Sequence, residues 1–412
     1  MEDRVSVDDL HWVTNIHSEE DQHYLNATPI IEDVKATVFD MCPDRSTPPK
    51  NFTTTTIVLI PKIEVPSTWK DFRPISLCSV TRKILSKVIN NQIVKLLPKI
   101  ISPSQSGFVQ VCMISDNILL AEELCHCLGK NGSLNNTIFK LDMEKAYDRV
   151  NWTFLYHMLG RVGFPTHWIN MIMKLIDNCW FNNLINGEGV GFFKSTRGLR
   201  QGDPLSPTLF VITAECLSRG LDWLFQRQPR MNFFARSNKN ISHLAFADDI
   251  IIFSKDTCKD LKTLMEFLRH YELISSQRIN KKKSSFTVDE KTSNMRIRCI
   301  QQVIGFKLKY LPITYLGAPL FKGNKKGVLF DELIQKIRNK ITGWEKTLLS
   351  HGGRLQLIKS ILSVMPTYLL QVLKPPKYVM EHIKRIFNKF LRGNTSDLRK
   401  LNWSSWEVVP TD

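Results

Sequence analysis

No stretch of this sequence is long and apolar enough to cross a membrane, which takes about 18 consecutive apolar residues. The opening segment, MEDRVSVDDLHW, is polar and acidic and lacks the apolar centre of a secretory leader. These two absences argue against a membrane protein and against secretion. We therefore expect an intracellular protein, nuclear or cytoplasmic, that has no membrane partner.

Cysteine pairs at metal-binding spacing are scarce as well. The chain has nine cysteines, but only Cys125 and Cys127 lie close together, around His126, and no second pair follows at the spacing of a zinc site. This pattern favours reduced structural thiols over a zinc site or a disulfide framework. Internal repeats are also absent, and no low-complexity tract extends beyond the short Lys281–Lys283 run.

Acidic residues are too few to balance the basic ones. The chain has 39 Asp and Glu against 56 Lys and Arg, which leaves a formal net charge of +17. Such an excess favours a polyanionic partner, and nucleic acid is the first candidate. A length of 412 residues with 43% hydrophobic residues allows two or three domains and a sizeable core. In the last third, basic residues interleave with apolar ones, as in a groove lining: Lys336, Arg338, Lys340, Lys346, Arg354 and Lys359.

Short β-branched runs alternate with helical patterns through most of the chain, which predicts a fold of the α+β class. We expect strands over 53–60 and 137–143, a hairpin over 184–196, and helices over 81–97, 152–176, 208–225 and 261–273. Ser206 and Pro207 suit the N-cap and first position of the third helix. The predicted domains are a remnant or linker over 1–51, a main domain over 52–322 and a helical domain over 323–412.

The segment HLAFADDIIIF places Asp248 and Asp249 between two apolar runs, which predicts a β-hairpin whose tight turn carries the acids. Like charges this close repel each other, so both stay ionised in a half-buried turn only beside a divalent cation. A solvated Asp-Asp turn without a metal ion would account for the same segment. The segment alone leaves the two interpretations open.

A third acid bears on that choice. Asp142 ends the apolar strand of KLDMEKAYDRV, 248 − 142 = 106 residues before Asp248, a separation natural for two central strands of one sheet. Asp142, Asp248 and Asp249 could together hold two hard cations about 3.5 to 4 Å apart, as in-line phosphoryl transfer requires. Carboxylates without a thiol or imidazole suit Mg²⁺, with Mn²⁺ as a possible substitute.

Seven ordered motifs carry a resemblance that spacing alone could not supply: LIPKIEVPSTWKDFRPISLCSV, IISPSQSGFVQ, SDNILLAEEL, KLDMEKAYDRVNW, STRGLRQGDPLSPTLF, HLAFADDIIIF and ITYLGAPLF. They resemble the reverse transcriptases of plant-type non-LTR (long interspersed) retrotransposons. The resemblance implies a right-hand polymerase, with fingers and an antiparallel palm sheet with helices over 52–322, followed by a helical thumb. It also implies an RNA-directed DNA polymerase whose partners are an RNA template, a DNA primer and dNTPs.

The resemblance assigns chemistry to four of these residues. Asp142, Asp248 and Asp249 match the metal-binding acids of the palm, so two Mg²⁺ ions are implied. Lys283 matches the lysine that protonates the departing pyrophosphate. On the residues alone, the Lys281–Lys283 run is equally a solvated turn.

Further positions match the nucleotide site of the family. Lys62 and Arg73 match cations that bind the triphosphate. Tyr147 matches an aromatic steric gate below the sugar. Core packing would also explain a tyrosine there, but its position five residues after Asp142 favours the gate. Gln201 and Gly202 match the loop that packs on the incoming nucleotide and the template.

A hairpin near the end of the resemblance, with Tyr315, Leu316 and Gly317, matches the primer grip. Asp148 and Arg149, by contrast, favour local pairing or capping over a role in chemistry.

The sequence also departs from the family. Val111 and Cys112 stand where the family has Gly-Arg, and a longer outer-fingers stretch before residue 49 is missing. These departures suggest a truncated copy that lacks the endonuclease and the C-terminal extension. Two alternatives therefore stay open: an impaired remnant that only binds nucleic acid, and a maturase-like RNA-binding factor. The sequence assigns no oligomeric state.

Overall fold

The computed structural model describes residues 7–15, 18–26, 29, 31–39, 41, 54–109, 113–130, 136–235, 240–324, 327–345 and 349–392. Val111 and Cys112 lie outside these residues, as does the predicted boundary at residue 51. The chain forms two compact units, Met1–Asn117 with Cys127–Tyr310, and Ile118–His126 with Leu311–Asp412. The predicted division after residue 322 stays a prediction.

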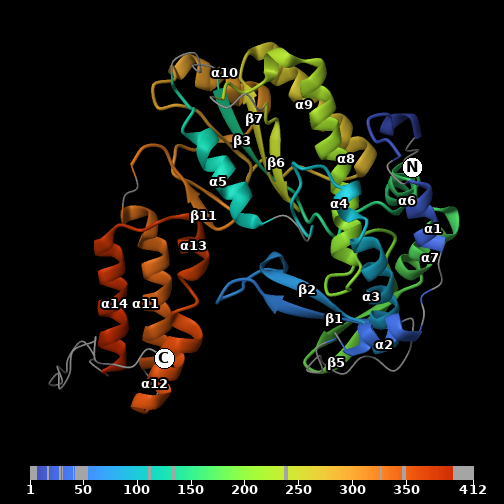
Figure 1. The fold of residues 1–412 in the computed structure, drawn as a ribbon, viewed down its shortest axis with the longest axis horizontal. Coiled ribbons are helices and arrows are strands. Elements are labelled where there is room, and N and C mark those ends of the chain that lie inside the picture. Colours follow the sequence, from blue (N-terminus) through green and yellow to red (C-terminus); the bar gives the residue numbers. More distant parts are fainter. Residues whose placement is uncertain are drawn as a thin grey trace. The chain divides into compact units, whose positions relative to one another are not determined.

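The first unit contains two sheets that carry most of the predicted site (Figure 1). A four-stranded sheet has the order β2-β1-β4-β5, with β1 (Thr54–Pro61), β2 (Phe72–Leu77), β4 (Trp180–Ile185) and β5 (Glu188–Lys194). A five-stranded sheet has the order β6-β7-β3-β8-β9, with β3 (Asn136–Asp142), β6 (His243–Phe246), β7 (Asp249–Lys255), β8 (Ser285–Thr287) and β9 (Lys307–Leu308). Strand β7 pairs antiparallel with both of its neighbours, the edge strand β6 and the central strand β3.

Helices of the first unit share a core with the five-stranded sheet. Phe139 of β3 and Ile252 of β7 belong to the same buried cluster as Phe154, Leu209 and Leu264 from three helices. The helices are α1 (Glu19–Asn26), α2 (Ile31–Phe39), α3 (Val80–Val94), α4 (Leu97–Ile100), α6 (Trp152–Val162), α7 (Thr166–Asp177), α8 (Ser206–Arg227), α9 (Cys258–Ser275) and α10 (Asn294–Ile304). Sheets combined with these helices confirm the predicted α+β class.

The second unit is mainly helical. It contains the hairpin of β10 (Ile313–Tyr315) and β11 (Ala318–Leu320), followed by α11 (Asp331–Glu345), α12 (His351–Leu357), α13 (Thr367–Val372) and α14 (Lys377–Leu391). Helix α5 (Ile114–Cys125) begins in the first unit and ends in the second. None of the described helices is both long and apolar enough to span a membrane. No disulfide joins the cysteines that the structure describes.

The segment 152–176 is mostly helical as predicted, but it forms two helices, because Gly163 adopts a left-handed φ of 111° after α6 and Pro165 is extended before α7. One local prediction was wrong. Ser206 is the first residue of α8 and not its N-cap. The N-cap is Leu205, whose backbone N–H donates a 3.0 Å hydrogen bond to Asp203 Oδ1.

The buried histidine of β6 predicts a pH dependence of stability. His243 is 0% exposed, its Nδ1 lies 2.8 Å from the Ser242 hydroxyl, and burial lowers its pKa to about 3. Below pH 6.5 the unfolded chain binds a proton at this histidine, whereas the folded chain does not until about pH 3. The free energy of unfolding should therefore fall on acidification in this window, by up to about 1.4 kcal/mol per pH unit.

Urea unfolding between pH 7 and 5 measures this slope. The His243→Gln variant keeps a polar side chain but cannot titrate, so its unfolding free energy should fall less steeply than that of the wild-type chain. Equal slopes in the two proteins would contradict the assignment.

Candidate active site

Two acidic strand ends meet in the centre of the five-stranded sheet. Asp142 is the last residue of β3 and Asp249 the first of β7, and the two are directly opposite in the antiparallel register. Phe246 of β6 also pairs with Asp249, so Ala247 and Asp248 form the turn between β6 and β7. Neighbouring strands lie about 4.8 Å apart. The register therefore gathers the three acids at one end of the sheet.

The three carboxylates share one electrostatic environment. Burial raises the pKa of Asp142, the Lys283 ammonium opposes this shift, and the Asp249 carboxylate adds to it. Asp248 reaches solvent, yet the protein around it still desolvates its carboxylate and raises its pKa, and the charges of Asp249 and Asp142 raise it further. A cation bound here would lower these pKa values by favouring the ionised carboxylates.

The donor set fits a hard divalent cation, because it consists of carboxylates without thiol or imidazole groups. As the side chains lie, no three His, Cys, Asp or Glu residues within the described ranges could hold one metal ion together. The three carboxylates therefore suit a divalent cation, because they are hard ligands and because a cation would relieve their mutual repulsion. Their side chains would have to rotate to coordinate one ion together.

A glutamine from outside the hairpin supports the turn that carries Asp248. The Oε1 of Gln105 accepts hydrogen bonds from the backbone N–H groups of Ala247, at 2.9 Å, and Gly107, at 3.0 Å. Ala247 has a φ of 56°, a left-handed conformation that costs energy for a residue with a Cβ. A Cβ on Gly107 would lie 2.4 Å from the Ala247 nitrogen, so glycine is required there.

Tyr147 lies between the core and the acids. Its ring stacks on Phe210, with centroids 4.6 Å apart and an interplanar angle of 14°. Burial raises the pKa of Tyr147 to about 12, and the charge of Asp248 adds to the shift. Core packing is therefore part of its role, and the steric-gate assignment stays a prediction.

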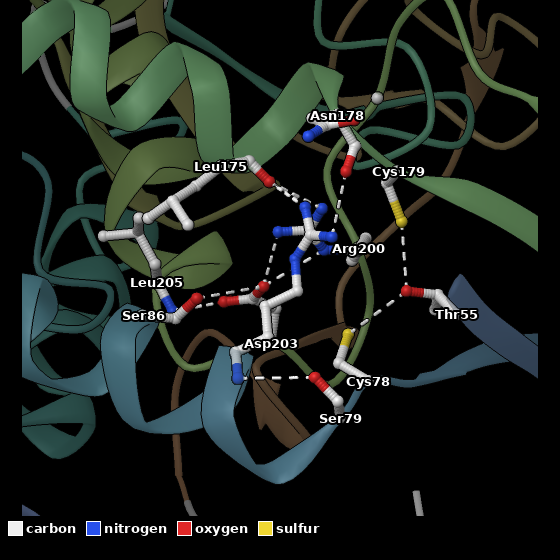
Figure 2. A network of polar contacts seen from close by, with 12 residues as sticks. Thr55, Cys78, Ser79, Ser86, Leu175, Asn178, Cys179, Arg200, Asp203 and Leu205 are labelled. Atoms are coloured by element: carbon white, nitrogen blue, oxygen red, sulfur yellow. Dashed lines mark hydrogen bonds and ion pairs between the residues drawn. The ribbon is translucent and has the colours of Figure 1, made fainter. Parts of the chain in front are cut away.

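A buried ion pair shapes the loop RGLRQGDPLSP (Figure 2). Arg200 and Asp203 are 9% and 3% exposed, and Nη2 and Nε of the arginine donate to Asp203 Oδ2 at 2.7 and 3.0 Å. Arg200 Nη1 also donates to the Leu175 carbonyl at the end of α7, at 2.9 Å. The Ser86 hydroxyl of α3 donates to Asp203 at 3.3 Å. The loop is thereby fastened to two helices.

Gln201 and Gly202 lie in the part of this loop that faces β2. The backbone N–H of Ser76 donates to the Gln201 carbonyl at 2.7 Å. Gly202 has a φ of 102°, and a Cβ there would lie 3.2 Å from the Ser76 carbonyl oxygen. Glycine at this position is thus explained by the close approach to a strand. The Gln201 amide also donates to Asp148 Oδ1, at 3.4 Å.

The sequence model of the family described as reverse transcriptase (RNA-dependent DNA polymerase) matches residues 60–320, which include the three acids and this loop. The chain belongs to the reverse transcriptase family. It is 29% identical over 329 residues to an uncharacterized protein of transposon TX1 from Xenopus laevis, a match that covers 78% of this chain and 24% of that protein. It is 28% identical over 233 residues to a Pol polyprotein of a type-2 retrotransposable element from Drosophila melanogaster, covering 56% and 21%.

These relatives confirm the resemblance to reverse transcriptases of non-LTR retrotransposons. The chain spans about a quarter or less of the length of the two curated relatives. A solved structure of apo telomerase from Candida tropicalis is also similar, with a TM-score of 0.46 and 15% identity over 87% of this chain and 66% of that one.

The two cations predicted to bind triphosphate lie on the first sheet of this reverse transcriptase. Lys62 directly follows β1, and its Nζ donates to the Lys70 carbonyl at 2.9 Å. Burial raises the pKa of Asp148, and the charges of Lys145 and Lys62 oppose this shift. Arg73 of β2 is exposed and pairs with Ile60 of β1. Both cations therefore lie near the outer end of the β1–β2 hairpin.

Lys283 lies in a turn that is anchored to the strand of Asp142. The backbone N–H of Asn280 donates to the Asp142 carbonyl at 2.8 Å, and Asn280 Oδ1 accepts from the Lys283 N–H at 3.2 Å. The side chain is exposed, and its ammonium acts on the Asp142 carboxylate as described above. Lys283 thus lies in a turn, as the solvated-turn interpretation expects, and also close to Asp142, as the proton-donor assignment expects.

The predicted primer-grip residues form the hairpin of the second unit. Leu316 and Gly317 have φ angles of 47° and 80° and make the two-residue turn between β10 and β11. The Tyr368 hydroxyl donates to the Leu316 carbonyl. Tyr315 is 0% exposed, so its side chain packs inside this unit, and only the turn is open to a ligand.

Gln105 is a positioning residue that the sequence interpretation missed, although it lies in the quoted motif IISPSQSGFVQ. We expect Gln105→Ala to slow primer extension about 100-fold, because small misplacements of reacting groups cost this much. Primer–template affinity should stay unchanged, since Gln105 is only 1% exposed. Single-turnover extension at a temperature below the melting transition measures the effect.

The exposed Gln302 of α10 offers a matched control, and Gln302→Ala should extend primers at the wild-type rate. Extension by Gln105→Ala within twofold of wild type would contradict the positioning role.

Proposed function

We propose that this chain is an RNA-directed DNA polymerase. It joins the 3′ hydroxyl of a DNA primer to the α-phosphate of a dNTP, copies an RNA template and releases pyrophosphate. The observation that carries the proposal is the register that sets Asp142 opposite Asp249, with Asp248 in the adjoining turn. The net charge of +17 suits a nucleic-acid partner.

Asp142, Asp248 and Asp249 would hold two Mg²⁺ ions, for which Mn²⁺ could substitute. Such ions, when bound, lower the pKa of the attacking hydroxyl and neutralise charge on the leaving phosphate oxygens. The raised pKa values of Asp142 and Asp248 support this role, because carboxylates that repel each other gain from a shared cation.

The remaining roles follow from position and charge. Lys283, next to Asp142, would donate a proton to the departing pyrophosphate. Lys62 and Arg73 would bind the triphosphate as charge-assisted partners. Tyr147, whose ring is held against Phe210, would limit the space below the sugar of the nucleotide.

Other segments would bind the nucleic acid. Gln201 and Gly202 would pack on the incoming nucleotide and the template, and the turn of Leu316 and Gly317 after Tyr315 would hold the primer end. In this proposal residues 52–322 are the fingers and palm, and residues 323–412 are the thumb.

The test is primer extension by the purified full chain with a primed RNA template, dNTPs and Mg²⁺. We expect extension that depends on the RNA sequence, stops when EDTA removes the metal, and returns when Mg²⁺ or Mn²⁺ is added in excess. Salt-sensitive binding of primer–template without any extension would contradict the proposal and favour a remnant that only binds nucleic acid. Val111 and Cys112, which motivated that alternative, lie outside the described residues.

A further inference from the structure

Four arginines of the first unit line one pocket of about 530 Å³. They are Arg149, Arg197, Arg269 and Arg278, and the rest of the lining is Glu272, Leu273, Ser276 and Gln277. The arginines that form ion pairs are different ones, and no carboxylate within the described ranges forms an ion pair with any of these four. Four guanidinium groups therefore share one concavity with a single carboxylate, that of Glu272, in its lining.

Backbone hydrogen bonds bring these arginines beside the catalytic strand end. The N–H of Glu144, two residues after Asp142, donates to the Arg278 carbonyl at 2.8 Å. The N–H of Gly198, which follows Arg197, donates to the Val150 carbonyl at 2.8 Å. The pocket is thus built on the segment that directly follows Asp142 and on the first residues of the loop RGLRQGDPLSP.

Arg149 of this group is held in place, because its Nε donates to the Ser276 carbonyl at 3.2 Å. The local pairing or capping predicted for Asp148 and Arg149 stays a prediction. Burial lowers the pKa of Arg149, and the charges of Arg278 and Arg197 lower it further. The Glu144 and Glu272 carboxylates oppose these shifts but do not cancel them, and Glu272 Oε1 accepts a 2.7 Å hydrogen bond from the Ile279 N–H. The cluster favours an anion.

The shape and lining indicate what kind of anion fits. A nucleic-acid strand is usually bound along an extended groove with aromatic side chains on which bases stack, and this lining has no aromatic residue. Several guanidinium groups around one concavity suit a compact group with several negative charges, since arginine binds phosphate oxygens in a bidentate manner.

We propose that this pocket is a second polyphosphate site, separate from Lys62 and Arg73, which binds either the triphosphate of a further dNTP or free pyrophosphate. The identity of this ligand rests on the proposed polymerase function, because the dNTP substrate carries a triphosphate and the released product is pyrophosphate. Binding itself needs neither the metal-binding acids nor a template.

The experiment is equilibrium binding of pyrophosphate, of a dNTP and of an unstructured DNA oligonucleotide to the full chain, in metal-free buffer at fixed salt. Arg197→Gln combined with Arg269→Gln removes two exposed guanidinium groups. This double variant should bind pyrophosphate and the dNTP at least about tenfold more weakly, because hydrogen bonds between charged groups are strong. Lys259→Gln with Lys262→Gln, also exposed on α9 and outside the lining, removes the same charge and should leave binding unchanged.

Three outcomes would overturn the proposal: no pyrophosphate binding by the wild-type chain, equal pyrophosphate binding by the two double variants, or a loss confined to the oligonucleotide. Circular dichroism checks that both variants fold. Asp248→Ala should bind pyrophosphate as the wild-type chain does even though it should not extend primers. A chain that binds pyrophosphate through these arginines but never extends a primer would refute the polymerase proposal alone.

Discussion

Asp248→Ala is expected to reduce template-directed primer extension by about a thousandfold or more. Asp248 lies in the β6–β7 turn, next to the Asp249 that pairs with Asp142, where its carboxylate would help to hold the metal ions that stabilise charge in the transition state. Such stabilisation contributes several kcal/mol, and each 1.36 kcal/mol corresponds to a factor of about ten in rate. Single-turnover extension with saturating primer–template measures the loss.

The melting temperature of Asp248→Ala distinguishes a catalytic effect from misfolding. Because burial and the charges of Asp249 and Asp142 disfavour the ionised Asp248, its removal should leave the melting temperature of the metal-free chain unchanged or higher. Glu290→Ala removes an exposed acid of the same unit and should retain full activity. If Asp248→Ala extended primers at the wild-type rate, Asp248 would not belong to the catalytic site.

Asp203→Ala is expected to cause the largest loss of stability. The substitution leaves the guanidinium of Arg200 buried without its carboxylate partner and removes the acceptor for the Leu205 N–H. Breaking a buried ion pair from one side costs about 3–5 kcal/mol. Urea unfolding should show this loss in the free energy of unfolding, and Glu290→Ala should change it by less than about 0.5 kcal/mol.

A double variant tests the physical cause. Asp203→Leu with Arg200→Met removes both charges, so the penalty for an unpaired buried charge disappears and part of the stability should return. If the double variant were less stable than Asp203→Ala, the effect would come from lost packing and not from the unpaired arginine.

Several features of the fold were predictable because they depend on neighbours in the sequence. The apolar runs around Asp142 and Asp248 predicted one strand and one hairpin, and these are β3 and the β6–β7 hairpin. The helix predicted over 208–225 lies within α8. The break after α6 was missed although Gly163 and Pro165 are visible in the sequence, because the apolar periodicity continues on both sides of it.

The sequence by itself determined the acids, the excess of positive charge and the motifs of a reverse transcriptase, because these are properties of residue type and local order. Only the tertiary structure decided which residues surround those acids. Gln105 and the Ala247 that it supports are 142 positions apart, and the arginines of the polyphosphate pocket come from segments that meet through backbone hydrogen bonds. Such contacts depend on strand register and loop path, which no local pattern specifies.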